Sequence, residues 1–167
     1  MLETQAKSDA IDVTPLLDGA AKTMRNTRYC WLATVTDDAF PHARPMGRVL
    51  NDPGEDQWKV RFLTDRRSNK AADMRRASQV SILVQHDPDL AFVTLIGKAE
   101  LHEDASETRS RWKAAYEVPS AADQANAIFV EVLIERMELW IRGVTPEPFG
   151  LRTTVLERDA EGWRLIS

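Results

Sequence analysis

After an initial helix-like segment, the sequence divides into short apolar segments separated by turn residues, and this pattern restricts the chain to a mainly β fold. The clearest segment is the run 58–62, where Trp58, Val60 and Phe62 alternate with two basic residues. Alternation with a period of two is typical of a half-buried strand. By the same reasoning, strands are predicted at 29–35, 42–50, 80–85, 91–101, 128–134 and 138–144, with a closing hairpin of 153–156 and 163–166.

These segments amount to about seven or eight mostly antiparallel strands. The segments 42–50 and 58–62, joined by the turn-rich 51–56, are predicted to form an antiparallel hairpin. The strands do not alternate regularly with helices, which argues against a doubly wound parallel sheet. The count favours a closed barrel over an open sheet, because closure removes exposed strand edges.

Helices are predicted at a few crossings between the strands. The first begins at Thr14 as the N-cap, followed by Pro15, and its apolar face would lie against the barrel. Further helices are predicted at 68–76, capped by Ser68, at 103–117 and at 121–127. No repeat or flexible linker interrupts the chain, so we expect a flexible tail at 1–12 and one domain at 13–167.

Composition excludes several classes of protein. The net charge of −4 and the pI of about 5.4 argue against a nucleic-acid partner. No apolar run is long enough to span a membrane, and the first residues lack the apolar region of a secretory signal. The single cysteine, Cys30, which we interpret as a buried strand thiol, fits a reducing compartment. The expected location is the cytoplasm.

Within this acidic chain, one stretch carries an excess of positive charge: Arg44, Arg48, Arg66, Arg67, Lys70, Arg75 and Arg76. A single basic island in an acidic protein favours a small anionic ligand over a polyanion.

Two elements of this stretch could bind such an anion. In a strand, Arg44 and Arg48 would share a face, and an arginine fork suits phosphate, while Gly47 would let a flat ligand approach the backbone. The second element is a helix start that carries Ser68, Asn69 and Lys70, where free N–H groups favour anions. The alternatives are ordinary surface arginines and a well-capped, solvated helix. Similarly, Trp140 could simply be core packing and Arg152 a surface residue.

The sequence shows no other chemistry. His42, His86 and His102 are isolated from one another, and no residues have metal-ligand spacing. There is no glycine-rich nucleotide-binding loop, no recognisable nucleophile–base pair and no obvious acid–base catalyst.

Taken together, several segments resemble the FMN-binding split-barrel superfamily of pyridoxamine-phosphate-oxidase-like proteins, especially its small members similar to general stress proteins. The resemblance runs from about residue 21 to residue 167. The segments that carry it are 29–35, 41–46, 62–64 with 68–70, 96–100 and 138–140. It implies a mainly β, mostly antiparallel, Greek-key-like split barrel that binds FMN.

The resemblance also implies roles for individual residues. Arg44 and Lys70 would bind the FMN phosphate, with Ser68 and Asn69 adding hydrogen bonds. The backbone around Pro45, Met46, Gly47, Leu63 and Thr64 would line the flavin ring and ribityl chain. Trp140 and Arg152 would come from the second subunit, so the resemblance implies a homodimer with the flavin at its interface.

The chain also departs from true pyridoxamine-phosphate oxidases. Val49 replaces a lysine and Phe92 replaces a glutamine, and the segment 144–150 lacks their substrate-binding Arg-x-His pair. Oxidation of vitamin B6 is therefore not expected.

The leading functional hypothesis is a flavin-dependent oxidoreductase acting on an unknown small substrate, with the cofactor supplying the chemistry. One alternative is a non-catalytic flavin-binding stress protein. Another is the same barrel with the deazaflavin F420 or haem as its cofactor. A nucleic-acid-binding barrel is disfavoured by the acidic pI.

Overall fold

The computed structural model describes residues 11–111 and 121–167. Its helices are α1 (Thr14–Arg25), α2 (Asn69–Arg76), the 3-10 turn η1 (Asp87–Asp89), α3 (Ala105–Arg111) and α4 (Ala121–Asn126). Its strands are β1 (Tyr29–Val35), β2 (Pro41–Gly47), β3 (Lys59–Asp65), β4 (Gln79–His86), β5 (Ala91–His102), β6 (Ala127–Ile141), β7 (Thr154–Asp159) and β8 (Gly162–Leu165). The predicted mainly β, mostly antiparallel fold is confirmed, and residues 112–117 of the predicted helix 103–117 lie outside the described residues.

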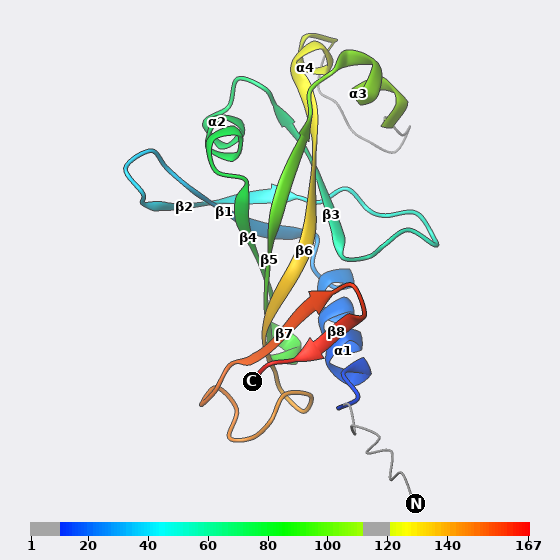
Figure 1. The fold of residues 1–167 in the computed structure, drawn as a ribbon, viewed down its shortest axis with the longest axis vertical. Coiled ribbons are helices and arrows are strands. Elements are labelled where there is room, and N and C mark those ends of the chain that lie inside the picture. Colours follow the sequence, from blue (N-terminus) through cyan, green and yellow to red (C-terminus); the bar gives the residue numbers. More distant parts are fainter. Residues whose placement is uncertain (1–10, 112–120) are drawn as a thin grey trace, which may run out of the picture.

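The eight strands follow the order β2-β1-β4-β5-β6-β7-β8, with β3 pairing β6 off this path (Figure 1). Every ladder between them is antiparallel. Strand β5 pairs along nearly the whole of one edge of β6. The other edge of β6 is shared between β3 in its first half and β7 in its second. Strand β6 is therefore the centre of the fold.

The prediction of two separate strands at 128–134 and 138–144 is wrong, because β6 is one strand of 15 residues. The polar pair Glu135 and Arg136 resembles a turn in the sequence. In the structure Ile96 pairs with Arg136 and Gly97 with Ile134, so Glu135 is the extra residue of a β-bulge. At this bulge the backbone of Leu133 closely approaches Gly97.

The predicted hairpin between 42–50 and 58–62 is also wrong. Strand β2 ends at Gly47 and pairs with β1, whereas β3 pairs with β6. The two segments meet only in an isolated bridge, in which the N–H of Val49 donates to the carbonyl of Arg61 at 2.9 Å. The sheet is therefore not closed by a continuous ladder, and the fold is a split barrel rather than the closed barrel that strand count favoured.

Helix α1 lies against the barrel with the predicted face, since Leu16, Ala20, Ala21 and Met24 are buried. Its predicted cap is wrong, because Thr14 is already inside the helix. The Oδ1 atom of Asp12 accepts a hydrogen bond from the Thr14 N–H at 2.9 Å. The N-cap is Val13, which makes no side-chain cap, so the carboxylate of Asp12 bonds the first N–H of the helix from one residue further out.

The core fills the barrel from the inward positions of the strands. Leu32, Phe62, Ile82, Leu95 and Met137 are each fully buried, on five different strands. Their outward neighbours form the opposite face, as period-two alternation requires. Within the described residues, no helix has the length and apolar character needed to cross a membrane.

Candidate functional site

The free edges of β2 and β3 define the split. Beyond the Val49–Arg61 bridge the two strands lead away from each other, and α2 follows directly from the end of β3 (Figure 1). If the register of the bridge continued, Gly47 would oppose Leu63 and Met46 would oppose Thr64, but no ladder forms between the strands in the described structure. The backbone positions predicted to line a flavin therefore belong to two facing strands that leave their hydrogen-bonding edges unpaired.

Arg44 is held at this split by two buried partners. Its Nη1 donates to Thr34 Oγ1 at 2.8 Å, and its Nη2 donates to Asp73 Oδ2 at 3.4 Å. Thr34 in turn donates its hydroxyl proton to the same Asp73 oxygen at 2.7 Å. The Arg44 side chain is only 16% exposed. Its guanidinium is therefore fixed in place before any ligand binds.

Lys70 lies three residues before Asp73 in α2, so both side chains belong to one face of the helix. Burial, and after it the positive charge of Arg44, lowers the pKa of Lys70, while Asp65 acts in the opposite direction. Arg44 thus lies close enough to affect the Lys70 ammonium electrostatically. Two partly buried cations therefore influence each other at the start of α2.

The start of α2 supplies hydroxyl and amide groups beside these cations. Ser68 is the N-cap, as predicted, and its Oγ accepts the N–H of Ala71 at 3.3 Å. Thr64 Oγ1, at the end of β3, is 3.4 Å from Ser68 Oγ. Asn69 is exposed on the first turn. Hydroxyl and amide side chains thus lie at the start of α2, where unpaired backbone N–H groups favour anions.

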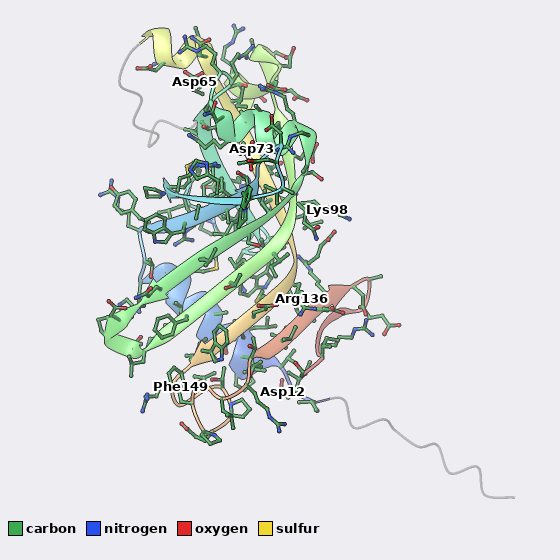
Figure 2. The ribbon with its side chains drawn as sticks, turned by 90° about the vertical axis from the view of Figure 1, so that its left-hand side faces the viewer. Asp12, Asp65, Asp73, Lys98, Arg136 and Phe149 are labelled. Carbon is green, nitrogen blue, oxygen red and sulfur yellow. The ribbon has the colours of Figure 1, made fainter. Side chains whose placement is uncertain are left out.

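Three residues singled out from the sequence lie elsewhere. Arg48 lies beyond the end of β2 and donates through Nη2 to the carbonyls of Met24 and Thr27, so it holds the end of α1 instead of joining Arg44. Trp140 is on β6, four strands from β2 along the sheet, and Arg152 is exposed in the following loop. Figure 2 shows Phe149 of that loop at the opposite end of the molecule from Asp73. One chain therefore does not bring Trp140 and Arg152 to Arg44.

Asp73 and Thr34 were missed by sequence reasoning. Both are buried, and both orient Arg44. A usable signal existed for Thr34, because it follows Cys30 and Leu32 at the inward positions of its strand. A polar residue at an inward position needs a buried partner.

The other titratable groups form no candidate metal site in the described ranges 11–111 and 121–167. Cys30 is buried as predicted, and burial raises the pKa of its thiol to about 11 despite the nearby charge of Arg48. His102 is not isolated: its Nε2 is 3.0 Å from Glu131 Oε1, and Glu131 also accepts from Arg61 Nε at 2.7 Å. Since a positively charged arginine is a poor neighbour for a metal cation, this cluster is best explained as a structural network.

The carboxyl of Asp73 should make the fold sensitive to acid. Burial tends to raise its pKa, but hydrogen bonds from Thr34 and Arg44 outweigh burial and hold the pKa below 3.8. The stabilisation is therefore fully present above pH 3.8 and is lost as pH falls through the lowered pKa of the folded state. We expect Asp73→Asn to lower the free energy of unfolding by about 1.5–3 kcal/mol at neutral pH, and by less in acid. Urea unfolding of both proteins from pH 7 to pH 3 measures the difference, and a constant difference would contradict this role.

The fold, an antiparallel sheet that is not closed between β2 and β3, is a split barrel. Residues 17–141 match the family model described as pyridoxamine 5'-phosphate oxidase, and the chain belongs to this family. A search of curated proteins finds no match in sequence.

Solved structures agree on the fold. A Clostridium acetobutylicum protein related to general stress protein 26 has a TM-score of 0.68 at 15% identity, covering 88% of this chain and 96% of its own. A pyridoxamine 5'-phosphate oxidase-related, FMN-binding protein from Nostoc punctiforme has a TM-score of 0.64 at 15% identity, covering 93% and 97%. PhzG from Burkholderia lata, solved with tetrahydrophenazine-1-carboxylic acid, has a TM-score of 0.62 at 17% identity, covering 99% and 96%.

Proposed function

We propose that this protein binds FMN in the split between β2 and β3 and acts as a flavin-dependent oxidoreductase on a small substrate. The observation that carries the proposal is the convergence of Arg44 and Lys70 at the start of α2. A phosphate dianion offsets the mutual repulsion of two such cations. The FMN-binding relative from Nostoc punctiforme supports the choice of ligand.

In this proposal each group has a distinct task. Arg44 and Lys70 bind the phosphate, and Ser68 and Asn69 add hydrogen bonds to it. The backbones of Pro45, Met46 and Gly47 on one strand and of Leu63 and Thr64 on the other lie along the ribityl chain and ring. Over this stretch β2 pairs with β1 and β3 with β6, so in the described structure the backbone groups on the other edge of each strand have no ladder partner and could serve a ligand.

Bound FMN would supply the electron or hydride transfer, and the protein would orient and shield it. The family's vitamin B6 substrate is not expected here. Val49 stands at the bridge where true oxidases have a lysine, and Phe92 replaces their glutamine directly opposite Trp140. An apolar environment replaces polar substrate contacts at both positions.

The single thiol, buried and far from reactive, is the reason for proposing the cytoplasm as the location.

The visible spectrum of the purified protein, with the mass of the released cofactor, tests the ligand. We expect the near-ultraviolet and blue bands of an oxidised flavin and a mass matching FMN. A spectrum typical of F420 or of haem would show that this cofactor is bound in place of FMN. A colourless protein that does not take up added FMN would refute the proposal. Turnover with NADH or NADPH and a set of electron acceptors then separates an enzyme from a protein that only binds flavin.

We propose further that the flavin site is completed by a second copy of the chain. The outward face of the sheet carries exposed apolar side chains in one row, in which Trp31 lies between its cross-strand partners Pro45 and Leu83. Trp31 is 52% exposed and Leu83 is 40% exposed. On β6, the indole Nε1 of Trp140 is buried with no hydrogen-bond partner among the described residues. A partner subunit that covers this face would bury the row and bring in the polar groups that one chain lacks.

Trp31→Glu is expected to weaken dimerisation by at least about 2 kcal/mol, roughly thirtyfold, because a buried tryptophan is a typical interface hot spot. Flavin affinity should fall with it. Sedimentation velocity across a range of concentrations measures the shift. Phe40→Glu is the matched control: Phe40 is 67% exposed but lies in the turn after β1. If Trp31→Glu and Phe40→Glu weakened dimerisation equally, the face around Trp31 would not be the dimer interface.

A further inference from the structure

The buried hydroxyl of Thr34 links the two charged groups that meet behind the split. Thr34 is on β1, Arg44 is on the neighbouring strand β2, and Asp73 is on α2. An arginine only donates hydrogen bonds and a carboxylate only accepts them, whereas a hydroxyl does both. Thr34 Oγ1 accepts from Arg44 Nη1 at 2.8 Å and donates to Asp73 Oδ2 at 2.7 Å. A valine has nearly the same shape but could make neither bond.

The two bonds through Thr34 are shorter than the direct ion pair. Arg44 Nη2 is 3.4 Å from Asp73 Oδ2, and the other oxygen of this carboxylate is 3.4 Å from Arg76 Nη2. Hydrogen bonds between nitrogen and oxygen are usually no longer than about 3.2 Å, so the direct contact alone would hold the guanidinium poorly. Thr34 therefore contributes more than Asp73 to the orientation of Arg44.

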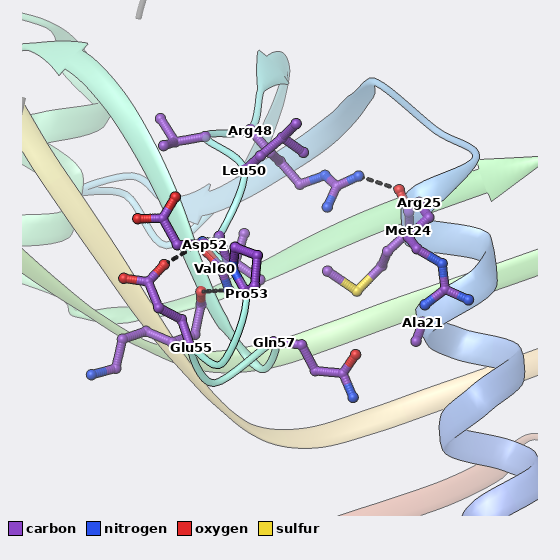
Figure 3. Close-up of a pocket in the computed structure, with 13 residues that line it drawn as sticks. Ala21, Met24, Arg25, Arg48, Leu50, Asp52, Pro53, Glu55, Gln57 and Val60 are labelled. Carbon is purple, nitrogen blue, oxygen red and sulfur yellow. Dashed lines mark hydrogen bonds between the residues drawn. The ribbon is translucent and has the colours of Figure 1, made fainter. Parts of the chain in front are cut away.

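Arg44 keeps a donor for a ligand, because its Nε has no hydrogen-bond partner among the described residues. This atom is not one of the buried atoms without a partner, so it has solvent-accessible area. Arg48 is the contrast: its Nη2 donates to the carbonyl of Met24 beside a pocket of about 350 Å³, but its Nε is buried (Figure 3). Of these two arginines, only Arg44 presents an unbonded Nε–H to solvent.

We propose that Thr34 is a positioning residue that gives the flavin site a preference for phosphorylated over unphosphorylated flavins. This inference rests on the proposed function. Thr34 is 1% exposed, so it does not touch the ligand. It fixes the plane of the Arg44 guanidinium, so that the donors left over by the two inward bonds meet the phosphate beside Lys70.

Loss of the hydroxyl would act on the phosphate alone. Without it, Arg44 can turn onto Asp73 and form the two parallel bonds that arginine and carboxylate favour, which takes its donors away from the phosphate. In the proposed site the flavin ring and ribityl chain contact the backbones of β2 and β3. Riboflavin, which has both of these parts but no phosphate, should therefore bind independently of Thr34.

Fluorescence titration of FMN and of riboflavin tests this role. We expect the wild-type protein to prefer FMN. Thr34→Val should weaken FMN binding by about tenfold and leave riboflavin binding unchanged, because ordering a mobile arginine on binding has an effect of about this size. Thr34→Ser, which keeps the hydroxyl, should retain the wild-type ratio of the two affinities. In an Arg44→Ala background, Thr34→Val should change neither affinity, since Thr34 acts through Arg44.

Thr23→Val is the matched control, because Thr23 is also buried and its Oγ1 donates to the carbonyl of Gly19 at 2.9 Å within α1. It removes the same atoms without touching Arg44 and should leave the affinity ratio unchanged. A measurement without any substitution is the ¹⁵N order parameter of Arg44 Nε in the wild-type protein before flavin is added. We expect it to be as high as that of the rigid backbone.

Several outcomes would overturn the role of Thr34: equal affinity of the wild-type protein for FMN and riboflavin, an unchanged ratio in Thr34→Val, an equal change in Thr23→Val, or a mobile Arg44 side chain. A wild-type protein that binds neither flavin would instead overturn the proposed function, and this inference with it.

Discussion

Replacing Arg44 and Lys70 together by alanine is expected to weaken FMN binding by about 3–6 kcal/mol, which is more than a hundredfold in the dissociation constant. In the proposed site each cation would contribute a charge-assisted contact of about 1.5–3 kcal/mol to the same phosphate. Fluorescence titration of FMN, which is quenched on binding, measures the loss. A double variant that keeps wild-type affinity would show that the phosphate lies elsewhere.

The controls for this experiment follow from the contacts of Arg44. Removing Arg44 takes away one of the two ion pairs of buried Asp73 and leaves only the pair with Arg76, so the double variant also loses stability. Lys70→Ala alone leaves the pair of Arg44 and Asp73 intact and should still weaken binding by about tenfold or more. Arg67→Ala removes a neighbouring exposed charge that is already bonded to Asp65, and it should have little effect.

Gly97→Ala is expected to destabilise the fold by about 3 kcal/mol or more. A Cβ atom at residue 97 would overlap the carbonyl oxygen of Leu133 and lie 2.8 Å from its carbonyl carbon. Overpacking usually costs about 1–3 kcal/mol, but here the obstacle is the backbone of the central strand, which cannot move aside as a side chain can. Urea unfolding monitored by circular dichroism measures the change.

Gly47→Ala is the matched control for stability, because Gly47 is also a strand glycine. A Cβ there would meet only the Tyr29 ring, at 3.8 Å and 4.0 Å, which is ordinary contact. We expect its free energy of unfolding to change by less than about 1 kcal/mol. If both variants were equally unstable, the loss would come from strand propensity and not from the close approach at the bulge.

Much of the secondary structure could be predicted because its signals are local. Period-two alternation located β3, and the hydroxyl of Ser68 located the start of α2. The pairing of β3 with β6 could not be predicted, since no local pattern records which distant strand completes a ladder. The continuity of β6 was missed for the same reason: its bulge exists only in relation to β5.

In the candidate site, too, some residues could be identified from the sequence and others could not. Arg44 and Lys70 were identified from residue type and from resemblance, and the fold brings them together. Asp73, which orients Arg44, was missed because a carboxylate in a short polar helix looks solvent-exposed until β1 packs against it. The roles of Trp140 and Arg152 stay predictions, because they depend on a second chain.

The position of β6 at the centre of the sheet also determines when the split can form during synthesis. In β3, Lys59 pairs with Leu133 and Asp65 pairs with Ala127, so this strand has no ladder partner until the ribosome has made β6. At about 5–20 residues per second, β3 waits several seconds with both edges exposed. Strands β1, β2, β4 and β5 can pair in the meantime. The nascent chain is therefore most open to aggregation, and to assistance by chaperones, in the interval before β6 leaves the ribosome.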